Sequence, residues 1–243
     1  MIIEVLGQLP PTPVRVSEEW TETDGHSWLQ LGKCYYTSGV ATADDDARAW
    51  ELVRRSTDLN EGRASASAKS EAIDIIATLR RSGLPDALVL VLVYRPPVDT
   101  WVIEMPARMI DAGETPDQAA RRELLEETGF TAAAASTSNG DGAGVLIPTT
   151  LCWPDPWKSR ENHYAAQLFI DGDDTANFLD ETTQALEPGE HIVPLLAPLV
   201  DHGKGLIDAL HEASEANGWL LEARLSGIAQ GLALAAQMFA SRL

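Results

Sequence analysis

Apolar residues occur along the chain in short runs that predict a sheet of several strands. Two of these runs, Ala72–Leu79 and Ala87–Tyr94, have the length of strands, and a polar segment with glycine and proline separates them. Closer to the N-terminus, Trp28–Thr37 and Ala49–Thr57 flank an acidic turn and predict a long hairpin. Further short strands are expected near Val145–Cys152 and His163–Ile170.

One helix has ends that the sequence defines well. Thr115 is its expected N-cap, because proline suits the first helical position and Gln118 completes a capping box. Gly129 is a typical stop, so we predict a helix over Pro116–Thr128. The C-terminal part of the chain is also predicted to be helical, since apolar residues recur there at helix spacing. These residues are Leu221, Leu225, Ile228, Leu232, Ala235 and Phe239.

Strands before, between and after the helices predict an α+β fold in which helices cover a mixed sheet. The small polar segment Asp58–Ser70 marks a boundary between two domains. We expect residues 1–62 to form a β-rich N-terminal domain and residues 63–243 to form the main domain. Within the main domain, Thr131–Gly144 is rich in alanine, serine and glycine and is expected to be a mobile insertion.

The chain of 243 residues is strongly acidic. Its 18 Lys and Arg residues against 37 Asp and Glu residues give a formal charge of −19. This charge argues against a nucleic-acid polymer or an anionic membrane as the main partner, because binding either needs a basic surface. A small anionic substrate is compatible with it only where metal ions or local basic groups offset the negative field.

Other features of the sequence bear on the compartment. Two cysteines, Cys34 and Cys152, do not make a disulfide framework and fit a reducing compartment. No basic region precedes an apolar stretch at the N-terminus, so a secretory signal is not expected. The longest apolar run, eight residues, is too short to span a bilayer. We therefore expect a cytoplasmic protein, with entry into the nucleus left open.

Three carboxylates share one face of the predicted helix, because Glu123, Glu126 and Glu127 stand at positions i, i+3 and i+4. Like charges at these spacings destabilise a helix by roughly 0.2–0.5 kcal/mol per pair, and the last turn of a helix favours cations. A divalent cation would resolve the conflict, and an oxygen-only ligand set favours Mg²⁺ or Mn²⁺. The alternative is a solvated acidic face that Arg122 partly neutralises, and the spacing alone leaves both interpretations open.

The surrounding residues resemble a known motif. Glu114, seven further residues, and then Arg122–Phe130 (R-E-L-L-E-E-T-G-F) resemble the Nudix box, G-x5-E-x7-R-E-U-x-E-E-x-G-U, in which U is a bulky apolar residue. One position departs from the box, since Arg108 stands where the first glycine belongs. Glycine usually marks a need for backbone freedom or close approach, so this departure bears on loop geometry and on activity.

Within the Nudix families the chain resembles the ADP-ribose and ADP-sugar pyrophosphatases. Glu104–Pro116 is similar to their E-[FL]-P-A-G-x-I-D-x-G-E-T-P run, and Arg95–Pro97 matches their R-P-P. The resemblance implies a Nudix-type α/β/α sandwich with a small N-terminal β-rich domain for substrate binding and dimerisation. It also implies Mg²⁺-dependent hydrolysis of ADP-ribose, extending to other ADP-sugars, to AMP and ribose 5-phosphate.

The same resemblance implies which residues carry the chemistry. Glu127 and Glu190 are the implied catalytic residues, and Glu114 and Arg122 are expected to form a structural ion pair. The implied ligands of Mg²⁺, or of Mn²⁺ in its place, are Glu123, Glu126, Glu127, Glu190 and the carbonyl of Ala107.

Substrate contacts follow from the resemblance as well. Trp28 and Trp50 would stack on adenine, although packing within the hairpin is the alternative role for both. The remaining implied contacts are Glu51 with the adenine amine, Arg55 and Arg95 with phosphate, and Met109 and Asp155 elsewhere on the substrate. Proteins of this kind pair as homodimers with exchanged N-terminal domains, so the tryptophans would act across subunits.

Two alternative functions remain at this point. One is a Nudix hydrolase of another nucleoside diphosphate derivative, because the sequence after Thr131 departs from the family. The other is a non-catalytic or weakly active ADP-ribose-binding module, which Arg108 in the glycine position suggests.

Overall fold

The computed structural model describes most of the chain as two compact units. The described residues are 4–5, 7, 29–36, 48–55, 72–133, 151–159, 161–203 and 205–240. The large unit comprises residues 1–16, 72–149 and 164–243, and the small unit comprises residues 17–71 and 150–163. Among the described helices, none is both long and apolar enough to cross a membrane.

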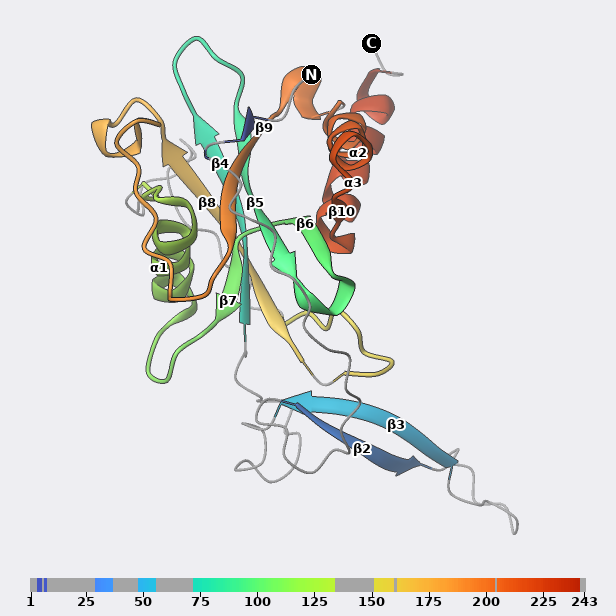
Figure 1. Cartoon of the computed structure of the whole chain (residues 1–243). Coiled ribbons are helices and arrows are strands. Elements are labelled where there is room, and N and C mark those ends of the chain that lie inside the picture. The colour runs from blue at the N-terminus through green and yellow to red at the C-terminus, as the bar shows by residue number, and fades with distance from the viewer. Residues whose placement is uncertain are drawn as a thin grey trace. The chain divides into compact units, whose positions relative to one another are not determined.

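The large unit is built on a sheet of eight strands (Figure 1). These are β1 (Glu4–Val5), β4 (Ala72–Arg80), β5 (Ala87–Arg95), β6 (Thr100–Glu104), β7 (Ala107–Met109), β8 (His163–Asp171), β9 (Ile192–Pro198) and β10 (Leu220–Leu221). Strand β5 is central, because it pairs antiparallel with β9 and also with β4 and β6. Strands β6 and β10 pair in parallel, so the sheet is mixed, as the sequence predicts.

Helices cover both faces of this sheet. Helix α1 (Pro116–Thr128) packs on one face, where Ala119, Ala120 and Leu124 meet the side chains of β4 and β8. Helices α2 (Leu206–Asn217) and α3 (Ala223–Ala240) pack on the other face against β5, β6 and β9 (Figure 1). Burial on both faces explains why Ala87–Tyr94 is an unbroken apolar run. The predicted α/β/α sandwich is therefore confirmed.

Helix α1 begins and ends where the sequence predicts. The Thr115 hydroxyl accepts a hydrogen bond from the Gln118 amide at 3.3 Å, and the Gln118 side-chain oxygen accepts one from the Thr115 amide at 2.9 Å. At the other end, Gly129 has a φ of 77° and its N–H donates to the Leu125 carbonyl at 2.8 Å. A left-handed residue of this kind ends the helix at little cost only if it is glycine.

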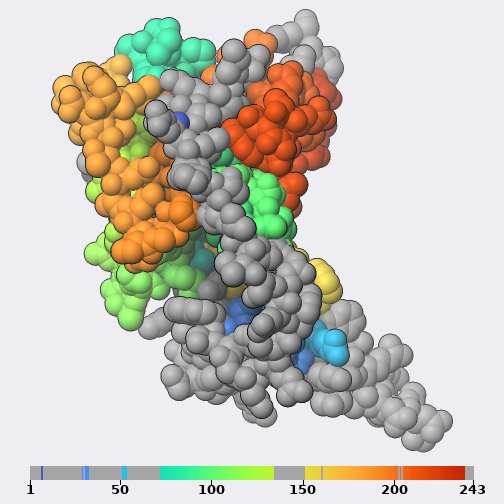
Figure 2. Space-filling model, viewed as in Figure 1, coloured from blue at the N-terminus to red at the C-terminus, as the bar shows by residue number. Residues whose placement is uncertain are grey.

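The segment between β8 and β9 runs along the side of α1. The Ala185 amide donates to the Glu126 carbonyl at 2.9 Å, and the Gln184 side chain donates to the Glu127 and Ile192 carbonyls. Carbonyls at the end of a helix have no partner within it, so this segment satisfies two of them. Figure 2 shows the segment, in light orange to orange, at the surface on the α1 side of the large unit.

Other elements differ from the sequence prediction or extend it. The strand predicted over His163–Ile170 is β8, and α3 covers the predicted C-terminal helical region from Ala223 onward. The prediction is wrong for Leu221, which pairs with Ile103 of β6 as part of β10. Of the predicted strand Val145–Cys152, the first six residues lie outside the described residues, and Cys152 forms an isolated bridge with His163. The expected insertion also lies outside them after Ala133. Helix α2 was not predicted. Short 3-10 helices in the described part of the chain cover Pro96–Val98, Thr175–Asn177 and Val200–Gly203.

The small unit contains the predicted hairpin. Strands β2 (Leu29–Tyr36) and β3 (Arg48–Arg55) pair antiparallel along their full length. Residues 151–159 belong to the same unit, because the Val53 amide donates to the Lys158 carbonyl at 2.7 Å and Val53 bridges Ser159 in parallel. The acidic turn that joins the two strands lies outside the described residues.

Candidate active site

Two of the three glutamates on α1 are buried. Glu123 is 0% exposed and Glu127 is 4% exposed, which is rare for glutamate unless the carboxylate is paired or binds a metal. Glu127 Oε2 accepts a hydrogen bond of 3.3 Å from the Ala107 amide on β7. These acids are therefore not the solvated face that was the alternative interpretation of their spacing.

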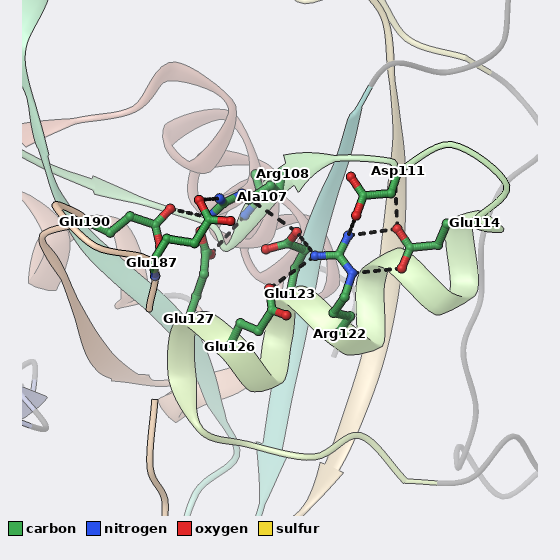
Figure 3. A network of polar contacts seen from close by, with 10 residues as sticks. All are labelled: Ala107, Arg108, Asp111, Glu114, Arg122, Glu123, Glu126, Glu127, Glu187 and Glu190. Atoms are coloured by element: carbon green, nitrogen blue, oxygen red, sulfur yellow. Dashed lines mark hydrogen bonds and ion pairs between the residues drawn. The ribbon is translucent and has the colours of Figure 1, made fainter. Parts of the chain in front are cut away.

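Arg122 holds the outer side of this cluster (Figure 3). Its Nε and Nη2 atoms donate to the two oxygens of Glu114 at 2.8 and 2.7 Å, so the expected ion pair is present. Its Nη1 atom donates to Glu126 at 3.1 Å and to Glu123 Oε1. Arg122 thus ties the loop before α1 to the helix and also neutralises part of the acidic charge.

Arg108 reaches the cluster from the strand β7. It is the cross-strand partner of Ile73, whose side chain belongs to the core beneath α1. Because facing residues in a sheet point to the same side, Arg108 projects toward α1. Its Nη2 lies 2.6 Å from Glu187 Oε2, its Nη1 pairs with Glu190 Oε1, and its Nε lies 3.9 Å from Glu123 Oε1 (Figure 3).

The backbone at Arg108 does not require glycine. Among the described residues, the non-glycine residues with positive φ are Asp99 and Asp201, and Arg108 pairs in regular strand register. A side chain at this position therefore introduces no backbone strain of the kind that glycine relieves.

A tight turn presents Glu190 to Arg108. Pro188 and Gly189 occupy its two central positions, Gly189 has a φ of 91°, and the Glu190 amide donates to the Glu187 carbonyl at 3.1 Å. Proline followed by a glycine with positive φ is typical of a type II turn. The carboxylate of Glu190 also folds back, since its Oε2 accepts from the Glu187 amide at 2.9 Å.

Burial changes the acidity of the α1 carboxylates. Burial raises the pKa of Glu123 to about 7, although the Arg122 guanidinium beside it opposes the change. Burial and the charge of Glu123 raise the pKa of Glu127 to about 8. Both groups therefore need additional positive charge to remain ionised at neutral pH.

The ligand atoms available at this site are of the type that a hard divalent cation prefers. They are carboxylate oxygens, and Glu123 Oε2 is buried with no hydrogen-bond partner in the described part of the chain. As the side chains lie, however, no three His, Cys, Asp or Glu residues among those described converge on one point as metal ligands would. Figure 3 shows the reason, because Glu123, Glu126 and Glu190 turn toward Arg108 and Arg122.

Two expected substrate contacts also lie in the large unit. Arg95, at the end of β5, donates through Nε and Nη2 to the two oxygens of Glu104 at 2.7 and 2.6 Å. This hydrogen bonding, with a smaller contribution from the charge of Glu127, holds the pKa of Arg95 above its usual value. Met109 is the last residue of β7 and is half-buried.

The other expected substrate contacts lie on the small unit or outside the described residues. Trp50, Glu51 and Arg55 are on β3, opposite Cys34, Lys33 and Leu29 respectively; the described side chains include neither Trp50 nor Arg55. Asp155 accepts a hydrogen bond of 3.2 Å from Trp157 Nε1 and pairs with Lys158 at 2.8 Å. Trp28 lies outside the described residues.

The sequence analysis did not predict an ion pair on β4, the strand next to β7. Asp74 on β4 is 3% exposed, and its two oxygens accept hydrogen bonds of 2.6 and 2.8 Å from Arg224 Nη1 at the start of α3. Arg224 Nε also donates to Glu222 at 2.7 Å. Asp74 is the cross-strand partner of Ala107, so the pair ties α3 to the sheet beside the candidate site. The only signal in the sequence was an aspartate within an apolar run.

Comparisons with known proteins place the chain in a family. Residues 70–209, more than half of the chain, match the family model of the NUDIX domain. A putative nudix hydrolase 2 of Caenorhabditis elegans is 32% identical over 169 residues, which are 70% of this chain and 66% of that protein. The ADP-ribose pyrophosphatase of Saccharomyces cerevisiae is 30% identical over 217 residues, 89% of this chain and 81% of that one.

Two further matches have related names. The ADP-sugar pyrophosphatase of Mus musculus is 31% identical over 150 residues, which are 62% of this chain and 59% of the mouse protein. A solved structure described as an ADP compounds hydrolase covers 90% of this chain and 97% of its own, with a TM-score of 0.45 and 14% identity.

Proposed function

The chain belongs to the Nudix family, and on that premise we propose that it hydrolyses the pyrophosphate bond of ADP-ribose with the aid of a divalent cation. The products are AMP and ribose 5-phosphate, and other ADP-sugars are candidate substrates. The yeast and mouse relatives, named for ADP-ribose and ADP-sugar pyrophosphatase activity, support this substrate class.

One observation carries the metal site. Glu123 and Glu127 are buried one turn apart on α1, and Glu123 keeps an oxygen without a hydrogen-bond partner among the described residues. An unpaired buried carboxylate oxygen is costly, and a divalent cation would satisfy it. We propose Glu123, Glu126, Glu127, Glu190 and the Ala107 carbonyl as ligands, and Mg²⁺ as the cation, with Mn²⁺ able to replace it.

The chain's own groups have distinct roles in this reaction. The cation supplies the positive charge that the crowded phosphate oxygens need. Glu190 accepts a proton from the attacking water as the new P–O bond forms and the bridging P–O bond breaks. Its position on a tight turn favours this role, since the turn sets the direction of the carboxylate. Arg122 holds Glu123 and Glu126 on the same side of α1.

Arg95 and Met109 are the substrate contacts proposed for the large unit, and the other proposed contacts belong to the small unit. Trp28 and Trp50 stack on adenine, Glu51 accepts from its amine, and Arg55 and Asp155 contact the phosphate and ribose parts. We further propose a homodimer that exchanges these N-terminal parts. Two cysteines in 243 residues support a cytoplasmic location.

The test compares carboxylate variants on one substrate. The wild-type chain, Glu123→Gln, Glu127→Gln and the control Glu215→Gln are incubated with Mg²⁺ and ADP-ribose, and AMP is quantified by chromatography. Glu215 is an exposed residue of α2, so its variant should keep the wild-type rate. We expect the two α1 variants to lose roughly 10²-fold or more in rate, as for loss of a group that stabilises charge in the transition state. Wild-type rates in both would refute the metal site.

A non-catalytic binding module is the second candidate, because Arg108 pairs with the proposed ligands Glu123 and Glu190. Calorimetric binding of ADP-ribose without any release of AMP would favour this function over hydrolysis. Release of AMP at rates above those of Glu127→Gln would exclude it.

A further inference from the structure

Arg108 supplies a positive charge at the place where the proposed cation is needed. Its guanidinium contacts Glu123 on α1 and both Glu187 and Glu190 on the turn between β8 and β9. The side chain is 27% exposed, while Glu123 is fully buried. The Arg108 guanidinium thus contacts two of the proposed metal ligands, Glu123 and Glu190.

The two arginines do not provide a hydrogen-bond partner for every oxygen of these carboxylates. Glu123 Oε1 is shared between Arg108 and Arg122, whereas Glu123 Oε2 is buried without a partner in the described part of the chain. Glu190 uses one oxygen for Arg108 and the other for the Glu187 amide. A cation that reached Glu123 Oε2 would give this buried oxygen a partner.

A guanidinium and a divalent cation compete for the same acids. Both are positively charged, so at short distance they repel each other. While Arg108 holds Glu190 Oε1, that atom points toward the arginine, and no three described acids converge on one point. A cation that binds Glu190 through Oε1 therefore competes with Arg108 for that atom.

We propose that Arg108 is a positioning residue that neutralises Glu123 and Glu190 until a divalent cation displaces its guanidinium. This inference rests on the metal site of the proposed function and adds the competition by Arg108. It also gives a reason why a side chain replaces glycine here, since the arginine holds the Glu187–Glu190 turn close to β7 in the metal-free chain.

The test measures metal binding rather than catalysis. Mn²⁺ is titrated into the metal-free full-length chain, and free Mn²⁺ is followed by electron paramagnetic resonance. The variants are Arg108→Gln, which keeps a polar side chain without charge, Arg108→Lys, which keeps a cation, and the control Arg121→Gln. Arg121 lies on α1 but contacts Asp117 and the carbonyls of Ala132 and Ala133, none of which is a proposed ligand.

Arg108→Gln is expected to bind Mn²⁺ roughly tenfold to hundredfold more tightly than the wild type, because at least one charge-assisted hydrogen bond no longer has to break. The Mn²⁺ affinity of Arg108→Lys should stay within about threefold of that of the wild type. Lysine keeps the competing positive charge, although it lacks the planar guanidinium that contacts two carboxylates at once. Arg121→Gln should change the affinity by less than about twofold, because the Arg121 guanidinium contacts Asp117 and the carbonyls of Ala132 and Ala133 and none of the proposed ligands.

A second readout covers the stability of the metal-free chain. Without Mn²⁺, Arg108→Gln should melt at a lower temperature than the wild type, and saturating Mn²⁺ should raise its melting temperature by more than it raises that of the wild type. Equal Mn²⁺ affinity in Arg108→Gln and the wild type, or weaker affinity in the variant, would overturn the competition while leaving the metal site in place. Absence of Mn²⁺ binding in every variant would overturn the metal site itself, and this inference with it.

Discussion

Replacement of Arg224 by methionine tests how the sheet beside the candidate site is held. The change removes the guanidinium that pairs with Asp74, which is 3% exposed, and with it two hydrogen bonds of 2.6 and 2.8 Å. Methionine keeps much of the apolar stem of arginine, so the main effect is the loss of a guanidinium and its hydrogen bonds beside a buried carboxylate. The large unit should therefore be clearly less stable, even though the changed residue lies on a helix far along the chain.

The magnitude follows from the burial of the two partners. Breaking one side of a buried ion pair costs about 3–5 kcal/mol. The Arg224 side chain is 35% exposed, so water can reach part of the space it leaves, and we expect the lower end, about 3 kcal/mol. At about 2–4 °C per kcal/mol for a chain of this size, the melting temperature should fall by roughly 6–12 °C.

Urea and thermal unfolding, followed by circular dichroism, measure this cost in Arg224→Met, in Asp74→Asn and in the double variant. Because Asp74→Asn removes the negative charge that loses its Arg224 guanidinium in Arg224→Met, the double variant should be less destabilised than the sum of the two single variants. In the single variant Arg224→Met, hydrogen exchange of α3 peptides should be faster than in the wild type. A loss below about 1 kcal/mol in Arg224→Met, the level of an exposed salt bridge, would refute this account of the ion pair.

Three further predictions follow from other parts of the structure. The Arg122 guanidinium beside Glu114 lowers the pKa of that carboxyl. The pair therefore stabilises the fold above the unfolded pKa of about 4.3, and this contribution is lost as the pH falls through the lower folded value. Glu114→Gln should reduce the stability at pH 7 and make the free energy of unfolding fall less steeply at acid pH, and an unchanged acid dependence would contradict the pairing. Gly189→Ala places a side chain at a φ of 91° with nothing within 4 Å of the new Cβ, so the cost is backbone strain of about 1–2 kcal/mol in the turn. The melting temperature should fall by about 2–8 °C, and kcat measured well below that temperature should fall as well. An unaltered kcat would show that the turn does not direct the reaction. If subunits exchange their N-terminal parts, mixing Trp50→Ala with Glu127→Gln chains should restore about a quarter of the wild-type activity, since half of the randomly formed dimers then hold one intact site; no restoration after subunit exchange would contradict the exchanged dimer.

Local signals made α1 and the hairpin predictable. Thr115, Gln118 and Gly129 define the helix through contacts within a few residues, and the structure has the helix over the predicted range. The acids of the Nudix box share a face because of helix periodicity alone. The hairpin likewise follows from two strand-like segments on either side of a turn.

The network around Arg108 could not be predicted in the same way. Its partners Glu187 and Glu190 are 79 and 82 residues away in the sequence, and its direction depends on its cross-strand position opposite Ile73. The Asp74–Arg224 pair joins residues 150 positions apart. Contacts of this kind depend on which strands become neighbours, which the pattern of one segment does not contain. The burial of Glu123 and Glu127 is likewise a property of the packed loop and sheet around α1.

The most direct measurement of the central claim is the release of AMP from ADP-ribose by the wild-type chain as the divalent cation is removed and restored. We predict that AMP and ribose 5-phosphate appear in equal amounts with Mg²⁺, that release stops when the ion is chelated, and that it resumes when Mg²⁺ is added back in excess. Absence of AMP with both Mg²⁺ and Mn²⁺, or release that continues undiminished under chelation, would contradict the account.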